Sequence, residues 1–250
     1  FTLTAYHSLL EAIQAAGYVC QSVEGYMDAP GEKRLVILRH DVDRRPENAL
    51  VVAELEHKVG IKSSYYFRTV KQVFQEDVIQ KIARLGHEIG YHYENLSHCS
   101  GDFGAAIADF EGNLERLRRL YPVRTVCMHG SPLSRLDNRK IWETFDYRDY
   151  GIIAEPYFDM DFNRVFYLSD TGRAWNDPGA SFRDKVDSHF HIPVKNTGHL
   201  IKRFQRDELP DHVMINTHPQ RWTDQPVSWT REMVGQPARN IVRRVITRFA

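Results

Sequence analysis

The sequence predicts an α/β fold built on a parallel β-sheet, and three observations support this prediction. Segments of strand character alternate with segments of helical period along most of the 250 residues. The apolar run at residues 35–38 is continuous, which is typical of a parallel strand covered on both faces. About seven strands are expected, a number that both an open doubly wound sheet and a closed barrel accept.

The first half of the chain contains the clearest elements. A helix is expected between Thr4, a common N-cap residue, and Gly17, because apolar residues recur at helical spacing between them. Strands and helices then alternate at residues 35–38 (strand), 46–60 (helix), 63–67 (strand), 76–86 (helix) and 88–92 (strand).

The second half continues the pattern with weaker signals. A long helix is expected from Asp102, followed by a strand at residues 125–128. Further elements are expected at residues 151–154, 165–168 and 212–216 (strands) and 198–206 (helix). No linker or repeat divides the chain, so we expect one catalytic domain over residues 1–250, with residues 1–30 as an N-terminal helical extension.

Composition excludes several classes of protein. Lys plus Arg and Asp plus Glu both number 33, so no basic excess favours a nucleic-acid partner. The three cysteines are an odd number without CxxC spacing, which favours a reducing compartment. No signal-peptide pattern and no apolar stretch of about 20 residues is found, so we expect no transmembrane segment and a cytoplasmic location.

Charged and imidazole side chains follow the predicted strands where these strands end. Because the carboxyl ends of parallel strands meet at one edge, these side chains are expected to converge on one pocket. Asp41 and Asp43 are two residues apart, so in extended backbone both face the same side. Two close carboxylates repel unless a cation neutralises one or one pKa rises. The full set is Asp41, Asp43, His92, Glu94, His129 and His218.

Three motifs resemble the polysaccharide deacetylases, the NodB-homology group similar to carbohydrate esterase family 4. They are "RHDVD" (39–43), "GHEIGYH" (86–92) and "MINTHP" (214–219), and the resemblance runs from about residue 35 to 219. It implies a distorted (β/α)7 TIM-like barrel of parallel strands. It also implies that Asp41 is the general base, Asp43 and His92 are metal ligands and His218 is the general acid.

Two positions depart from the family pattern. The usual second histidine is replaced by Leu96, so Glu94, His98 or His129 must supply the third ligand. We favour Glu94, because residue i+2 of an extended strand reaches the same side without a special loop. The family arginine near the base is also missing from "CMHGSP" (127–132), and His129 is expected to orient Asp41 or the substrate instead.

The resemblance implies a metal-dependent hydrolase that removes an N-acyl group, N-acetyl above all, from an amino sugar or glycoconjugate. The cofactor is a divalent metal, with zinc preferred and manganese, iron or cobalt also suited. Arg221, Trp222 and Trp175 are expected to contact the carbohydrate. The alternatives are a silent carbohydrate-binding protein of the same fold and a related deformylase or cyclic-amide hydrolase. The oligomeric state is left open.

Overall fold

The computed structural model describes residues 1–30, 34–131, 134–175, 184, 186–227, 229, 230 and 233. In this part of the chain, seven strands form one sheet in which every pairing is parallel. The strands are β1 (Val19–Gln21), β2 (Leu35–Val42), β3 (Ser64–Phe67), β4 (Glu88–Tyr93), β5 (Val126–Met128), β6 (Phe166–Ser169) and β7 (His212–Thr217). Their order is β5-β4-β3-β2-β7-β6, with β1 paired to β2.

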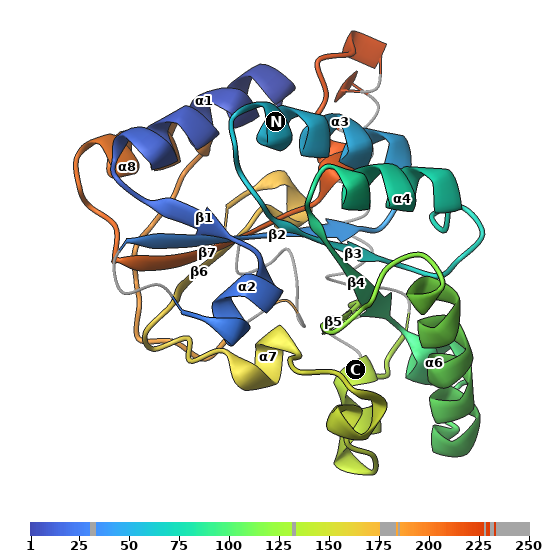
Figure 1. Ribbon diagram of the computed structural model, residues 1–250. Helices are drawn as coiled ribbons and strands as arrows, with labels where there is room; N and C mark the ends of the chain where they lie inside the picture. Colours follow the sequence, from blue (N-terminus) through green and yellow to red (C-terminus); the bar gives the residue numbers. More distant parts are fainter. Residues whose placement is uncertain are drawn as a thin grey trace.

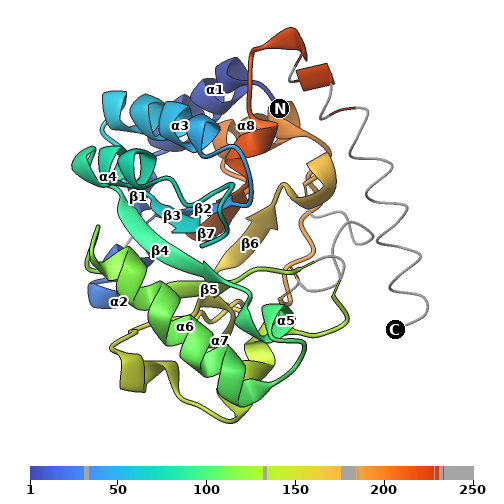
Figure 2. The ribbon, with the colours of Figure 1, turned by 90° about the vertical axis from the view of Figure 1, so that its right-hand side faces the viewer.

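The sheet curls into an incomplete barrel, and helices cover it (Figure 1). The α-helices are α1 (Leu3–Ala15), α2 (Val23–Asp28), α3 (Pro46–Lys58), α4 (Glu76–Arg84), α5 (Asn95–His98), α6 (Phe103–Arg118), α7 (Pro156–Asp159) and α8 (Thr197–Gln205). In Figure 1, α1, α3 and α4 lie above the sheet, whereas α2 and α7 lie below it. Helix α6 runs beside β4 and β5 (Figure 2), and α1 packs on α8. The predicted α/β fold with seven parallel strands is therefore confirmed.

Strand β2 shows how the sequence positions the site. Its eight residues are all buried, as the continuous apolar run predicts. Val36 and Leu38 pack into the core on the face that α1, α3 and α4 cover. Ile37 points to the opposite face and packs into a second hydrophobic cluster, inside the barrel. By the same alternation Arg39 and Asp41 point into the barrel. The strand thus delivers two charged side chains to the barrel interior.

The seventh strand is not the one that was predicted. Residues 151–154 form only an isolated bridge, in which Ala154 pairs with Thr125. Gly151 has φ = 70° and Pro156 begins α7, so too few extended residues remain between them for a strand. Instead β1 completes the sheet by pairing with the first half of β2.

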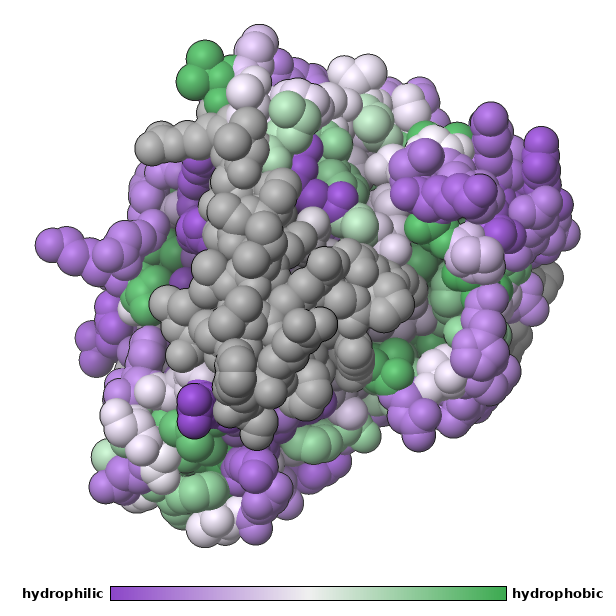
Figure 3. Space-filling view, turned by 180° about the vertical axis from the view of Figure 1, so that it is seen from behind, coloured by the Kyte–Doolittle hydropathy of each residue, from purple (hydrophilic) through white to green (hydrophobic). Residues whose placement is uncertain are grey.

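The first 30 residues belong to the sheet and its helical cover. Helix α1 begins after Thr2, whose side chain accepts a hydrogen bond from the Ala5 amide, rather than at the predicted Thr4. Residues 1–30 were predicted as a helical extension, yet they also contain β1. No helix among the described residues has the length and apolar character needed to cross a bilayer. Figure 3 shows hydrophilic residues around the edge of one face, with hydrophobic residues in small separate groups.

Candidate metal and active site

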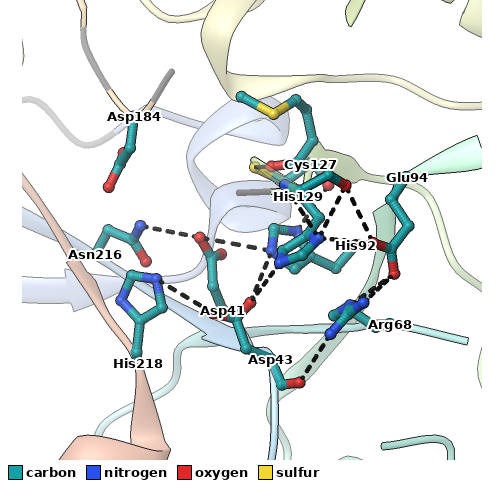
Figure 4. A network of polar contacts seen from close by, with 12 residues as sticks. Asp41, Asp43, Arg68, His92, Glu94, Cys127, His129, Asp184, Asn216 and His218 are labelled. Atoms are coloured by element: carbon teal, nitrogen blue, oxygen red, sulfur yellow. Dashed lines mark hydrogen bonds and ion pairs between the residues drawn. The ribbon is translucent and has the colours of Figure 1, made fainter. Parts of the chain in front are cut away.

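The predicted acidic and imidazole residues meet at the carboxyl ends of the strands (Figure 4). Asp41 lies on β2 and Asp43 directly follows that strand, and His218 directly follows β7. Figure 4 shows the two aspartates between His218 on one side and His92 and His129 on the other. The convergence expected for parallel strands therefore holds for these five residues.

Asp43 is the centre of a group that could hold a metal ion. Its Oδ1 atom lies 3.4 Å from His92 Nε2 and 3.5 Å from His129 Nε2. One ligand atom from each of these three residues falls within 4.8 Å of the others. His218 Nε2 lies 3.9 Å from Asp43 Oδ2, on the other side of the carboxylate.

Hydrogen bonds at Nδ1 orient both imidazoles toward Asp43. His92 Nδ1 lies 2.9 Å from the carbonyl oxygen of Cys127, and His129 Nδ1 lies 2.8 Å from Glu94 Oε2. Because a carbonyl or a carboxylate oxygen accepts a hydrogen bond from Nδ1–H, the lone pair of each neutral ring is on Nε2. This second bond is a usual feature of metal-ligating histidines.

The donor set fits a divalent cation. Asp43 Oδ1 is buried and has no hydrogen-bond partner within the described residues, although a buried carboxylate oxygen normally has one. One carboxylate and two imidazoles match the three protein ligands of a catalytic zinc site, and manganese, iron and cobalt accept the same atoms. Burial raises the pKa of Asp43, but His129, His92 and His218 outweigh burial and hold that pKa well below its usual range.

Arg39 holds Asp41 in a fork of two hydrogen bonds. Its Nε donates to Asp41 Oδ1 at 2.9 Å and its Nη2 donates to Oδ2 at 2.8 Å, and Asn216 Nδ2 also donates to Oδ2 at 3.0 Å. Burial raises the pKa of Asp41, but Arg39 and His92 outweigh burial and lower it. Asp41 is therefore a carboxylate at neutral pH. His129 was predicted to orient Asp41 or the substrate, and in the structure the side chain that orients Asp41 is Arg39.

Asp170, directly after β6, orients His218. Asp170 Oδ1 lies 2.6 Å from His218 Nδ1, so His218 Nε2 faces the site. Burial raises the pKa of Asp170, but Arg221 and His218 outweigh burial and lower it. Sequence reasoning missed both Asp170 and Arg39. Asp170 comes two residues after the strand predicted at 165–168, and Arg39 directly follows the one predicted at 35–38, so the rule that identified the other residues also applies to these two.

Glu94 was predicted to be the third metal ligand, but its carboxylate is bound to other side chains. Both Glu94 oxygens are engaged, Oε1 by the Arg68 guanidinium at 2.6 Å and Oε2 by His129 Nδ1 at 2.8 Å. Burial raises the pKa of Glu94, but His129 and Arg68 outweigh burial and lower it to about 2. His98, the other alternative, approaches Glu94 Oε1 at 3.5 Å. Leu96 is buried in the core on α5. His129 Nε2 therefore occupies the position near Asp43 that was expected for Glu94.

The three residues predicted to contact carbohydrate are buried behind the site. Arg221 donates to Asp170 Oδ1 at 2.6 Å, and Trp222 Nε1 donates to Asp170 Oδ2 at 2.8 Å. Trp175 is 4% exposed and packs against Trp222 and Phe1. Side chains this deeply buried leave no ring face for a sugar, which corrects the prediction. Arg221 and Trp222 instead hold Asp170 in place.

A pocket of about 680 Å³ opens beside the metal site. Asp43, Glu94 and His129 form part of its wall, so a molecule in the pocket would lie next to the cation. Other parts of the wall come from the loops after β2 and β5 and from the residues of α5. This arrangement provides a binding space beside the residues that could hold the cation.

Comparison with known proteins finds solved structures that resemble this chain at low sequence identity. No protein-family model matches the chain, and no curated protein matches it. A CE4 esterase of Streptococcus mutans is similar over 95% of this chain and 91% of its own, with 14% identity and a TM-score of 0.48. A CE4 family pseudoenzyme of Bacillus anthracis is similar over 84% of this chain, with 13% identity and a TM-score of 0.45. The peptidoglycan deacetylase PdaC of Bacillus subtilis is similar over 85% of this chain and 97% of its own, with 10% identity and a TM-score of 0.38.

These solved structures carry the names of the group that the motifs resemble. The chain spans 61% of the pseudoenzyme's length. One of the three is called a pseudoenzyme and another an esterase, so similarity to this group does not assign an activity. The activity has to follow from the side chains of this chain.

Proposed function

We propose that the chain is a metal-dependent hydrolase that removes an N-acyl group, in the simplest case acetyl, from an amino sugar or glycoconjugate. One observation carries the proposal. A buried, unpartnered Asp43 Oδ1 faces the Nε2 atoms of His92 and His129, and Asp41 and His218 flank this group on two sides. Metal-assisted hydrolysis of an amide needs a base, an acid and a Lewis-acidic cation, and this arrangement offers candidates for the base and the acid and residues that could hold the cation.

Asp43, His92 and His129 would hold the cation, and Glu94 would support His129 from behind. When bound, a divalent cation acts as a Lewis acid toward water and toward the acyl carbonyl. The assignment of His129 as third ligand rests on the position of its Nε2 atom, 3.5 Å from Asp43 Oδ1. Glu94 is assigned to the support of His129 because its two oxygens already accept hydrogen bonds from other side chains.

Asp41 and His218 would move the protons. Asp41, ionised and fixed by Arg39, accepts a proton from water as the water oxygen bonds to the acyl carbon. His218 Nε2 then donates a proton to the amide nitrogen as the C–N bond breaks, which yields acetate and a free amine. Asp170 at Nδ1 stabilises the protonated ring before this transfer. A proton transfer of this kind contributes about 10²-fold to 10⁴-fold to a rate.

The test is acetate release from N-acetylated amino sugars by the metal-loaded protein and by Asp41→Asn. Asparagine keeps the shape of the side chain but cannot accept the proton, so we expect a loss of about 10²-fold or more with metal content unchanged. Bound metal without acetate release from any such substrate would instead favour the silent carbohydrate-binding alternative. Equal rates for the wild type and Asp41→Asn would contradict the role of Asp41 as base.

A further inference from the structure

The pocket beside the metal site has a strongly cationic wall. Three arginines line it, namely Arg44, Arg68 and Arg135, together with four serines. Among the described residues, Leu136 is the one aliphatic side chain that lines this pocket. We call this space the arginine-lined pocket. A neutral sugar would not need three guanidinium groups around it.

The carboxylates of this wall neutralise only one of its three arginines, Arg68. Of the lining residues that the structure describes, only Asp43 and Glu94 are acidic. Asp43 faces the imidazoles of the metal site, and Glu94 is bound by Arg68 and His129. Two guanidinium groups, those of Arg44 and Arg135, therefore remain without a counter-charge from the wall. A bound divalent cation would add to the positive charge.

Arg44 and Arg135 are both exposed, and neither forms an ion pair with any residue in the described ranges. Arg68, by contrast, is fixed, because it donates to Glu94 Oε1 and to the backbone carbonyl of Asp43. The pocket thus combines one guanidinium that is fixed beside the metal site with two that are exposed and without an ion pair among the described residues. Guanidinium groups bind phosphate and carboxylate oxygens in pairs, which makes arginine suited to this recognition.

Ser97 adds a hydroxyl to the same wall. Its Oγ atom is buried and has no hydrogen-bond partner among the described residues, although its amide is bound to Asn138. An unpartnered hydroxyl in a pocket can donate to a ligand oxygen, and a buried polar group without such a partner is unfavourable. This observation is independent of the charge of the arginines, and it also favours a ligand rich in acceptor oxygens.

We propose that the arginine-lined pocket binds an anionic group of the substrate, a phosphate or a carboxylate, while the acyl group lies at the metal site. The inference deepens the proposed function, on which it rests, by naming the substrate class as an acidic N-acyl amino sugar. The anionic group would be held by Arg68 and by the two exposed arginines, Arg44 and Arg135. Neutral N-acyl sugars would bind more weakly because these guanidinium groups would keep only water as partners.

The experiment measures binding separately from turnover. The metal-loaded Asp41→Asn variant is titrated by calorimetry with N-acetylglucosamine, its 1-phosphate, its 6-phosphate and N-acetylmuramic acid. We expect at least one anionic sugar to bind about 10-fold to 100-fold more tightly than N-acetylglucosamine, as charge-assisted hydrogen bonds would produce. Comparing the two sugar phosphates with N-acetylmuramic acid shows whether the pocket prefers a phosphate or a carboxylate. Equal binding of the neutral sugar and all three acidic sugars would overturn the proposal.

A second arm shows where the charge is bound. Arg135→Gln and Arg44→Gln, each made in the Asp41→Asn protein, should reduce the preference for the anionic sugar by about 10-fold. Arg206→Gln is the matched control, because Arg206 is an exposed arginine at the end of α8 and does not line the pocket. It should leave the preference unchanged. A preference that survives both pocket substitutions would place the anion on the cation itself and would overturn the proposal.

Wild-type turnover then separates the two proposals. Hydrolysis of N-acetylglucosamine at the same kcat/KM as the acidic sugars would overturn the anionic preference and leave the proposed hydrolase intact. Tight binding of an acidic sugar with no acetate released from any of the four sugars would overturn the hydrolase and leave the anion pocket intact. Faster hydrolysis of an acidic sugar, with a KM that rises in salt, would support both, since salt screens exposed charges.

Discussion

Glu94 Oε2 lies 2.8 Å from His129 Nδ1, and this bond turns the other nitrogen of the His129 ring toward Asp43. Two neighbouring strands thus supply a candidate metal ligand, His129, and the residue that orients it, Glu94. The imidazole from the end of β5 presents Nε2 to the metal site, while the carboxylate from the end of β4 fixes the ring. A ligand and its support have different sensitivities to mutation, because loss of a supporting partner typically reduces metal affinity by about 10-fold to 100-fold.

Replacing Arg39 with lysine should change the pH dependence of activity. Lysine keeps the charge but cannot form the fork of two bonds that lowers the pKa of Asp41. We expect the pKa of Asp41 to rise. Because the base acts only when it is ionised, the variant should lose activity on acidification at a higher pH than the wild type does. The acidic limb of kcat/KM against pH should therefore move upward. An unchanged acidic limb, with reduced kcat/KM throughout, would show that Arg39 only supports the fold.

Asp170→Asn should impair the acid without removing the metal. Asparagine lacks the negative charge that stabilises protonated His218, and its amide could present a donor where a proton acceptor is needed. We expect kcat for an N-acetyl substrate to fall by about 10²-fold or more while metal content stays the same. Substrates with better leaving groups should lose less, because they need less protonation. A uniform loss for all leaving groups would contradict the assignment.

Glu56 should make stability depend on pH. It is fully buried on α3, where the Tyr65 hydroxyl donates to Oε2 at 2.7 Å and His40 Nε2 lies 2.8 Å from Oε1. Burial raises the pKa of Glu56, but His40 outweighs burial and lowers it to about 2. Because the folded pKa is below the unfolded value of about 4.5, this stabilisation is complete above about pH 4.5 and is lost as the pH falls toward 2.

The expected size of this effect at neutral pH is about 3 kcal/mol. Urea unfolding of the wild type and of Glu56→Gln at pH 7 and pH 3 measures it. The difference in unfolding free energy between the two proteins should be large at pH 7 and should shrink at pH 3. A difference of the same size at both pH values would mean that Glu56 contributes through packing rather than through its charge.

Gly90→Ala should destabilise the fold without acting on the chemistry directly. A Cβ at position 90 would collide with the ring of Tyr66, which is fully buried and bonded to Thr125 through its hydroxyl. Overpacking of this kind costs about 1–3 kcal/mol. Thermal unfolding should show a lower Tm, by about 2–4 °C for each kcal/mol. Gly112→Ala is the matched control, because a Cβ there meets no atom within 4 Å.

The sequence predicted the elements that carry the site better than the contacts within it. The buried run of β2 and the pair Asp41 and Asp43 were predictable, because strand periodicity and parallel topology are local or general properties. The partnership of His218 with Asp170 depends on which strands become neighbours, and β6 pairs with β7 only in the folded sheet. Glu94 was assigned to the metal because the periodicity gives its direction but not the competing guanidinium of Arg68.

Short elements were the other weak point of the prediction. β1 has three residues, too few for a periodic pattern, and its place in the sheet depends on register with β2. Residues 151–154 are apolar enough to suggest a strand, but the turn at Gly151 and the helix start at Pro156 leave a single bridge. Trp175 and Trp222 were misassigned to a sugar because burial of an aromatic ring is not visible in the sequence around it.

The most direct test of the central claim is the affinity of the metal-stripped protein for zinc or manganese, measured by titration calorimetry. The wild type should bind one ion per chain. His129→Gln, which removes a ligand atom, should lose nearly all binding, whereas Glu94→Gln should weaken it by about 10-fold to 100-fold. Binding that survives His129→Gln but is abolished by Glu94→Gln, or a wild type that binds no ion, would contradict the metal site formed by Asp43, His92 and His129.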